Sequence, residues 1–194
     1  MIISKQNSGR IVASLIFLTP IIVLFASSAL FYSGYSPEGT INKGTLLDDP
    51  IQLSELKLDV DSGPLKDEFP GKWSIVQFVS GDCLEKCWDT LYSSRQINIR
   101  LAKNSDRVVR YLINIGTNNL SNQSIEKITE EYPSLFIGTI QLELLPLSVS
   151  EKLQDSPYVL FDPLGNGILI YDSTLPSGEL LEDIKKVLQN SKIG

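Results

Sequence analysis

Histidine is absent from the 194 residues of this chain, which contains only two cysteines and one methionine. Without histidine, the chain cannot form the Ser-His or Cys-His pairs of many hydrolases, nor a zinc site with imidazole ligands. Two cysteines are also too few for a closed structural zinc site, which needs four ligands. The two cysteines are therefore the most distinctive side chains chemically.

Basic residues are also fewer than acidic ones, with 17 Lys and Arg against 23 Asp and Glu. Residues 1–32 hold two of the basic residues and none of the acidic ones, so the remainder carries a net charge of −8. Nucleic acid is therefore not expected as a partner. A glycine-rich phosphate loop is not expected either, because Gly165 and Gly167 fall in a predicted hairpin turn rather than before a helix.

The amino-terminal part contains a run of 22 uncharged, largely apolar residues, 11–32. This length is enough to span a bilayer. Lys5 and Arg10 precede the run, so we expect the amino end in the cytoplasm and the rest of the chain to be exported. A retained anchor is favoured because the run exceeds the apolar region of about 7 to 15 residues in signal peptides. A signal peptide cleaved near the small residues 26–29 is the alternative.

We expect four segments along the chain. They are a cytoplasmic amino terminus (1–10), a transmembrane anchor (11–32), a tether and amino-terminal arm (33–71), and a folded domain (72–194). The exported part is long enough for one domain with a hydrophobic core. Within 33–71 the apolar pieces are short, which indicates a tether followed by a short hairpin or an arm packed on the domain.

Hydrophobic periodicity predicts the elements of the domain. In order, they are a strand at 73–79, a helix from about 83 to 104, a strand at 107–115, a helix at 121–132, a possible short strand within 136–144, a brief helix at 148–154, a hairpin of 158–161 and 168–171, and a helix from 177. Ser148 and Glu151 could form a capping box for the brief helix. This order predicts an α/β, thioredoxin-like fold, in which helices flank a central mixed sheet.

Cys83 and Cys87 follow directly on the first predicted strand. Four residues apart on one helical face, they would be close enough to share a metal or to form a disulfide. At the start of a helix, the dipole and unpaired N–H groups favour a thiolate at Cys83, and the more buried Cys87 would act as the resolving thiol. A structural disulfide is the alternative, although a bridge that closes so small a loop removes little entropy from the unfolded chain.

Charged and aromatic neighbours surround the cysteine pair. Lys86 should help to stabilise a thiolate, whereas Asp82 and Glu85 oppose it. Trp88 is expected in the core or at its rim beside the thiols, because large aromatic side chains are usually well buried.

At this point the residues resemble the Sco/SenC-type thioredoxin-like proteins, which help to assemble cytochrome c oxidase. The resemblance lies in a single amino-terminal anchor, the C-x-x-x-C spacing of Cys83 and Cys87, and the D-P-x-G turn at residues 162–165, and it spans about 42–188. It implies a protein of the bacterial inner membrane whose carboxy-terminal domain lies in the periplasm. There it would deliver Cu(I), or keep thiols reduced, for the dinuclear copper centre of oxidase subunit II, or act with another assembly factor.

This chain departs from that family in two ways. Copper-binding members add a histidine to the two cysteines, and this chain has none. Leu84 and Trp88 also stand where prolines usually follow the family's cysteines. Cys83 and Cys87 could still hold Cu(I), a soft ion, but a stable Cu(II) site without imidazole is not expected. Thiol chemistry or transient Cu(I) handling is therefore favoured over a three-ligand copper site.

Pro157 precedes the predicted strand 158–161, at the point where thioredoxin-like reductases carry a cis-proline that shapes the docking surface for substrate thiols. We therefore expect a cis bond before Pro157, with an ordinary trans proline at the start of a strand as the alternative.

Three functions remain open from the sequence. The first is an oxidase assembly factor that works through Cys83 and Cys87. The second is a general membrane-tethered thiol-disulfide oxidoreductase, for example in cytochrome c maturation, and the third is a non-catalytic interaction module with a permanent disulfide. Whether the chain is an enzyme depends on which of these holds.

Overall fold

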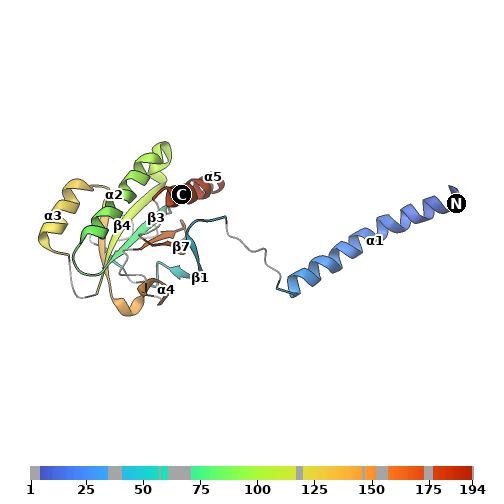
Figure 1. Ribbon diagram of the computed structural model, residues 1–194, viewed down its shortest axis with the longest axis horizontal. Coiled ribbons are helices and arrows are strands. Elements are labelled where there is room, and N and C mark those ends of the chain that lie inside the picture. The colour runs from blue at the N-terminus through green and yellow to red at the C-terminus, as the bar shows by residue number, and fades with distance from the viewer. Residues whose placement is uncertain are drawn as a thin grey trace. The chain divides into compact units, whose positions relative to one another are not determined.

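The computed structural model describes residues 5–34, 41–56, 58–60, 71–116, 120–145, 147–151, 157–172 and 177–193 (Figure 1). The chain divides into two compact units, Met1–Gly39 and Thr40–Gly194. Each unit is described by itself below.

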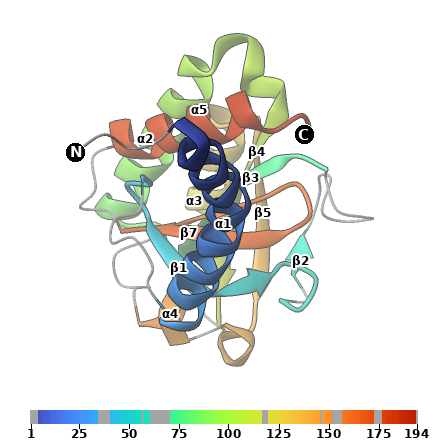
Figure 2. The same cartoon turned by 90° about the vertical axis from the view of Figure 1, so that its right-hand side faces the viewer.

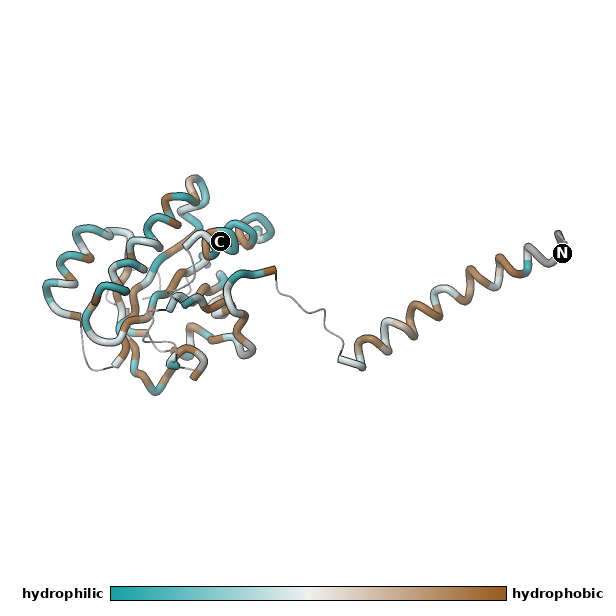
Figure 3. The backbone as a smooth tube through the Cα atoms, viewed as in Figure 1, coloured by the Kyte–Doolittle hydropathy of each residue, from teal (hydrophilic) through white to brown (hydrophobic). Residues whose placement is uncertain are grey.

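The first unit contains one long helix, α1 (Lys5–Tyr32). Its portion Gly9–Tyr32 has a mean hydropathy of 2.3 and is long and apolar enough to cross a membrane. Figure 3 shows the apolar character along this helix. The hydroxyl groups of Thr19 and Ser27 donate hydrogen bonds to the backbone of the preceding turn, which satisfies them without water. The expected apolar helix, a candidate membrane span by length and composition, is therefore present.

The second unit is built on a mixed seven-stranded sheet, counted over the described residues. Its strands are β1 (Thr45–Gln52), β2 (Asp59–Val60), β3 (Trp73–Val79), β4 (Val108–Ile115), β5 (Leu135–Ile140), β6 (Tyr158–Phe161) and β7 (Asn166–Tyr171). They are arranged in the order β1-β7-β6-β3-β4-β5-β2. The pairs β3·β4 and β4·β5 are parallel, and the other pairs are antiparallel.

Helices complete the unit. They are α2 (Glu85–Arg100), α3 (Asn122–Glu131), α4 (Leu147–Ser150) and α5 (Ser177–Asn190), with 3₁₀ turns at Ala102–Arg107 and Leu142–Leu144. The views in Figures 1 and 2 agree that α2 and α5 lie side by side over the sheet. This mixed sheet flanked by helices confirms the predicted fold class.

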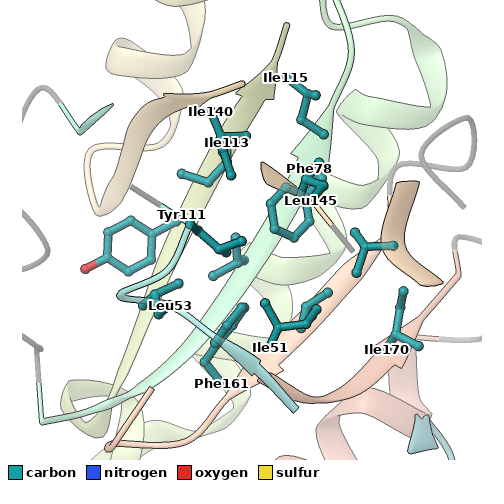
Figure 4. Close-up of a cluster of buried hydrophobic side chains, with 14 of the residues drawn as sticks. Ile51, Leu53, Phe78, Tyr111, Ile113, Ile115, Ile140, Leu145, Phe161 and Ile170 are labelled. Carbon is teal, nitrogen blue, oxygen red and sulfur yellow. The ribbon is translucent and has the colours of Figure 1, made fainter. Parts of the chain in front are cut away.

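Strand β3 is buried along its whole length, because both faces of the sheet are covered. Successive side chains of a strand point to opposite faces. Ile75 and Val79 pack with residues of α2, α3 and α5, whereas Val76 and Phe78 pack into a second cluster on the other face. That second cluster includes Ile51 of β1 and Leu145 (Figure 4). A strand enclosed on both faces reads as a nearly continuous apolar run, as 73–79 does.

Two predicted helices differ from those observed. The helix after Cys83 begins at Glu85 and ends at Arg100, because Ala102 takes a left-handed conformation (φ 49°) and a 3₁₀ turn follows. Cys83 therefore precedes the helix instead of lying within it. The brief helix begins at Leu147, so Ser148 lies inside it and is not the expected cap.

The amino-terminal arm contributes strands to the sheet instead of a hairpin. Strand β1 pairs with β7 and β2 pairs with β5, so these two strands lie at opposite edges of the sheet. Among the described residues of this segment, β1 and β2 therefore do not pair with each other as a hairpin.

The side chain of Asp183 in α5 anchors the start of β1. It is fully buried and accepts hydrogen bonds from the backbone N–H groups of Lys43 (2.7 Å) and Gly44 (3.0 Å) and from the hydroxyl of Tyr171 (3.0 Å). Burial, together with the charge of Asp183, raises the pKa of Tyr171. At Gly44, a Cβ atom would lie 2.5 Å from the Tyr171 ring, so only glycine fits there.

We predict that Asp183→Ala lowers the free energy of unfolding by about 2–4 kcal/mol, because it leaves buried donors without an acceptor. Asp183→Asn should cost less, since it keeps one acceptor oxygen. Urea unfolding of the full chain in detergent micelles measures both. The exposed neighbour Glu182, changed to Ala, is the control. Equal losses for Asp183→Ala and Glu182→Ala would contradict the anchoring role.

Candidate functional site

The site lies where β3 leads into α2. After Val79 the chain turns at Gly81, which has a positive φ of 80°. Leu84 occupies the position before α2 without making a side-chain cap, and its side chain is exposed. Cys83 therefore belongs to the connecting loop, and Cys87 lies in the first turn of the helix.

Cys83 and Cys87 form a disulfide, with their Cα atoms 5.2 Å apart. The structure thus brings together the two residues that the sequence singled out. Both are buried, with exposed fractions of 5% for Cys83 and 2% for Cys87. The expected order of burial is observed, but the difference is small.

Apolar side chains enclose the disulfide. The cluster around it contains Val79, Leu91, Leu112, Leu120, Ile128, Tyr132 and Leu135, with Trp88 and Ile137 packed at its margin. These residues come from β3, α2, β4, α3 and β5, so several elements of the domain converge on the cysteine pair.

A buried polar network lies between the disulfide and the sheet. The side-chain nitrogen Nε2 of Gln77 lies 3.8 Å from Sγ of Cys87, 3.3 Å from the backbone oxygen of Cys87 and 2.6 Å from Oγ1 of Thr90. The hydroxyl of Tyr158 donates to the backbone oxygen of Thr90. Burial raises the pKa of Tyr158, so this hydroxyl keeps its proton. This network was not predicted from the sequence, where the only signal for it was a glutamine within an apolar strand.

Asp82 holds the cysteine loop against the start of α3. Its Oδ1 atom accepts hydrogen bonds from the backbone N–H of Cys83 (2.9 Å) and from the N–H and hydroxyl of Ser121 (3.1 Å each). Hydrogen bonds from Ser124 and Ser121 lower the pKa of Asp82 from its ordinary value of 3.8 to about 2. Ser121 is also the cap of α3, so one carboxylate connects two elements of the site.

The other expected neighbours take different places. Lys86 is exposed at the start of α2. Trp88 is half-buried, and Nζ of Lys127 lies 4.1 Å from the centre of its ring, a cation–π contact between α2 and α3.

Pro157 is buried, and its backbone oxygen accepts a hydrogen bond from the N–H of Phe78 in β3. The bond before Pro157 involves Ser156, which lies outside the described residues, so the cis bond stays a prediction.

A pocket of about 1170 Å³ opens beside the disulfide. Its lining is Val79, Ser80, Asp82, Leu84, Glu85, Lys86, Cys87, Leu142, Glu143, Leu145, Leu147 and Ser150. Leucine side chains therefore supply apolar surface, and the charged residues belong mainly to the loop and the first turn of α2. Such a pocket can admit a side chain or a short polypeptide segment next to Cys87.

Metal binding at this site depends on the two sulfur atoms. Within the described part of the chain, no group of three or more His, Cys, Asp or Glu residues is placed to hold a metal ion. A metal would need the thiolates of Cys83 and Cys87, which are bonded to each other here, so the disulfide must be reduced first.

Residues 73–191 match the family described as "Transmembrane-like, thioredoxin-like, C-terminal domain". The match covers more than half of the chain, and the chain belongs to this family. A search of curated proteins gave no match.

Several solved structures share the fold. Yeast Sco1 is 18% identical over 77% of this chain and 98% of its own, with a TM-score of 0.54. Arabidopsis thaliana ScoI with copper bound is 19% identical over 76% and 99%, with a TM-score of 0.51. A thioredoxin-like protein in the oxidised form is 16% identical over 74% and 97%, also with a TM-score of 0.51. The resemblance to Sco-type proteins is therefore confirmed at the level of the fold.

We predict that Asp82→Ala destabilises the protein at neutral pH but has little effect near pH 2. The folded-state pKa of Asp82 is held below its ordinary value, so its stabilising contribution is present above about pH 4. That contribution is lost as the pH falls from about 4 towards 2. Urea unfolding of both proteins across this range measures the difference.

Asp89→Ala is the matched control, because it removes a charge of the same sign from the exposed surface of α2 without breaking these hydrogen bonds. A difference between wild type and Asp82→Ala that stays constant from pH 7 to pH 2 would contradict the prediction.

Proposed function

We propose that this protein is a membrane-anchored, thioredoxin-like factor that assists the assembly of a copper-containing cytochrome c oxidase. It would act through Cys83 and Cys87, by reducing thiols of oxidase subunit II or of another assembly factor, or by delivering Cu(I). The observation that carries the proposal is the Cys83–Cys87 disulfide, which closes at the start of α2 beside a pocket. The fold shared with Sco proteins supports it.

The anchor helix supports a place at the membrane surface. Gly9–Tyr32 is long and apolar enough to span a bilayer. Lys5 and Arg10 precede most of this stretch and favour an amino terminus in the cytoplasm. The thioredoxin-like unit would then face the periplasm of a bacterium, where disulfides persist.

The chemistry is a thiol–disulfide exchange. In the dithiol form, the thiolate of Cys83 attacks a client disulfide and forms a mixed disulfide, releasing one client thiol. Cys87 then attacks Cys83, which releases the second client thiol and restores the observed disulfide. Cys83 suits the first step, because it lies in a loop and can move without unwinding α2. A further thiol reductant must regenerate the dithiol.

Cu(I) delivery would use the same two sulfur atoms. Thiolates are soft ligands that select Cu(I), and the chain has no imidazole to support Cu(II). Copper would therefore be a transient cargo of the dithiol form.

One observation favours a second candidate, a general membrane-tethered thiol-disulfide oxidoreductase. The chain has no histidine, so it lacks the imidazole ligand of copper-binding Sco-type proteins. The thiol exchange described above does not need that ligand and does not depend on an oxidase client.

Replacing both cysteines by Ser should lower the activity of copper-containing cytochrome c oxidase as much as deletion of the gene does. Quinol oxidases without that copper centre should keep their activity. Both activities are measured in membranes from the wild type, the deletion and the double variant, with the amount of protein checked by immunoblot.

Two outcomes of this experiment would overturn the proposal. Full oxidase activity in the double variant, with a defect only in the deletion, would mean that the protein acts as a scaffold. An unchanged oxidase in the deletion, with defects in other thiol-dependent processes, would favour the general oxidoreductase.

We also predict that the reduced protein binds at most one Cu(I), and that Cys83→Ser and Cys87→Ser each weaken binding strongly. No strong Cys-to-Cu(II) charge-transfer band should develop with Cu(II), because imidazole ligands are lacking. Anaerobic titration of the three proteins with Cu(I) in a competing chelator is the measurement. Equal affinity in all three would show that the thiolates are not the ligands.

A further inference from the structure

We propose that Gln77 is a positioning residue that sets the redox equilibrium of the Cys83–Cys87 pair through a hydrogen bond to Cys87. The inference rests on the proposed thiol chemistry of this pair. Gln77 lies in β3 and is 1% exposed. Its side chain faces the first turn of α2 and contacts Cys87.

The orientation of the Gln77 amide follows from its neighbours. The backbone oxygen of Cys87, 3.3 Å away, can only accept a hydrogen bond, so the amide must turn its NH₂ group towards it. The hydroxyl of Thr90 lies within donor distance of the backbone oxygens of Lys86 and Cys87, so its oxygen is free to accept from Gln77. The same NH₂ group lies 3.8 Å from Sγ of Cys87, so its two hydrogens are shared among three acceptors, namely this sulfur, the backbone oxygen of Cys87 and Oγ1 of Thr90.

The other end of the amide, Oε1 of Gln77, is buried and accepts no hydrogen bond from the described residues. A buried polar atom without a partner lowers the stability of the fold, and an apolar side chain of similar size would avoid this cost. The NH₂ group, with its contacts to Cys87 and Thr90, is therefore the part of the Gln77 amide that the fold uses.

The hydrogen bond matters more in the reduced form than in the disulfide. Reduction breaks the S–S bond and adds two electrons and two protons, which thiols supply as they form their own disulfide. When the reduced Cys87 loses its proton, its sulfur becomes a charged acceptor, which a donor stabilises more than it stabilises the neutral sulfur of the disulfide. Gln77 should therefore favour the dithiol and make the pair a stronger oxidant.

Both partners of this hydrogen bond stand on rigid elements. Gln77 lies in a strand paired on both sides, with Leu112 of β4 and with Tyr158 of β6. Cys87 lies within α2, whereas Cys83 lies in the loop before it. When the disulfide opens, the loop can move while Cys87 stays against Gln77, so the contact is retained in the dithiol.

The test is the equilibrium of the full chain in detergent with reduced and oxidised glutathione, for wild type, Gln77→Leu and Gln77→Asn. Free thiols are counted after alkylation by mass spectrometry. For Gln77→Leu, we expect the equilibrium constant for dithiol formation to fall about tenfold, which is about 30 mV for a two-electron couple. Gln77→Asn keeps an amide that is too short to reach the sulfur, so its constant should fall in the same direction.

Ser94→Ala is the matched control. Ser94 is a buried polar residue of α2 that donates to the backbone oxygen of Leu91 and accepts from Arg110. Its loss should disturb packing without shifting the redox equilibrium. Unfolding of the oxidised proteins in urea should show that Gln77→Leu is no less stable than wild type.

The outcomes separate this inference from the proposed function. A wild-type pair that cycles, with the same constant in Gln77→Leu and Gln77→Asn, would overturn the role of Gln77 alone. An equally large change of the equilibrium constant in Ser94→Ala would also overturn it, because a general packing effect would then explain the change. A wild-type pair that stays closed in glutathione and in dithiothreitol would overturn the thiol function and this inference with it.

Discussion

The burial of strand β3 on both faces is the constraint on which the rest of the site depends. A strand enclosed in this way must satisfy its polar side chains inside the protein, because water does not reach them. The NH₂ group of Gln77 meets this requirement through the first turn of α2, at Cys87 and Thr90. The hydrogen bonds of Gln77 therefore also fix the distance between the first turn of α2 and the sheet. They thereby fix the position of the Cys87 sulfur.

The two cysteines are held by different means. Cys87 is fixed by the helix and by a core side chain, whereas the loop that carries Cys83 is held at the protein surface by Asp82. The carboxylate of Asp82 reaches Ser121 at the start of α3, so the loop is tied to a neighbouring helix. Once the disulfide opens, Cys87 is still held within α2, whereas Cys83 is held through the hydrogen bonds of Asp82. The two sulfurs are therefore inequivalent, although both are buried.

The sequence was most informative where the pattern was local and strong. Alternating or continuous apolar residues predicted β3, β4 and the β6–β7 hairpin, and the cysteine spacing predicted that the two sulfurs could share a metal or form a disulfide. The edges occupied by β1 and β2 were not predictable, because the partner of a short strand depends on tertiary packing. The end of α2 was missed because Ala102 adopts a left-handed conformation without the glycine that usually signals it. Gln77 was missed because its partners lie on another element.

The lack of histidine makes the redox equilibrium of the pair decisive for either proposed activity. Reducing a client disulfide requires the dithiol, and so does holding Cu(I), because no third side chain among the described residues is placed to bind a metal with the two sulfurs. A residue that shifts the balance between disulfide and dithiol would therefore act on both activities at once. In this chain, the atoms around Cys87 therefore set the balance between disulfide and dithiol. The hydrogen bond from Gln77 is the polar contact to the Cys87 sulfur in the described network.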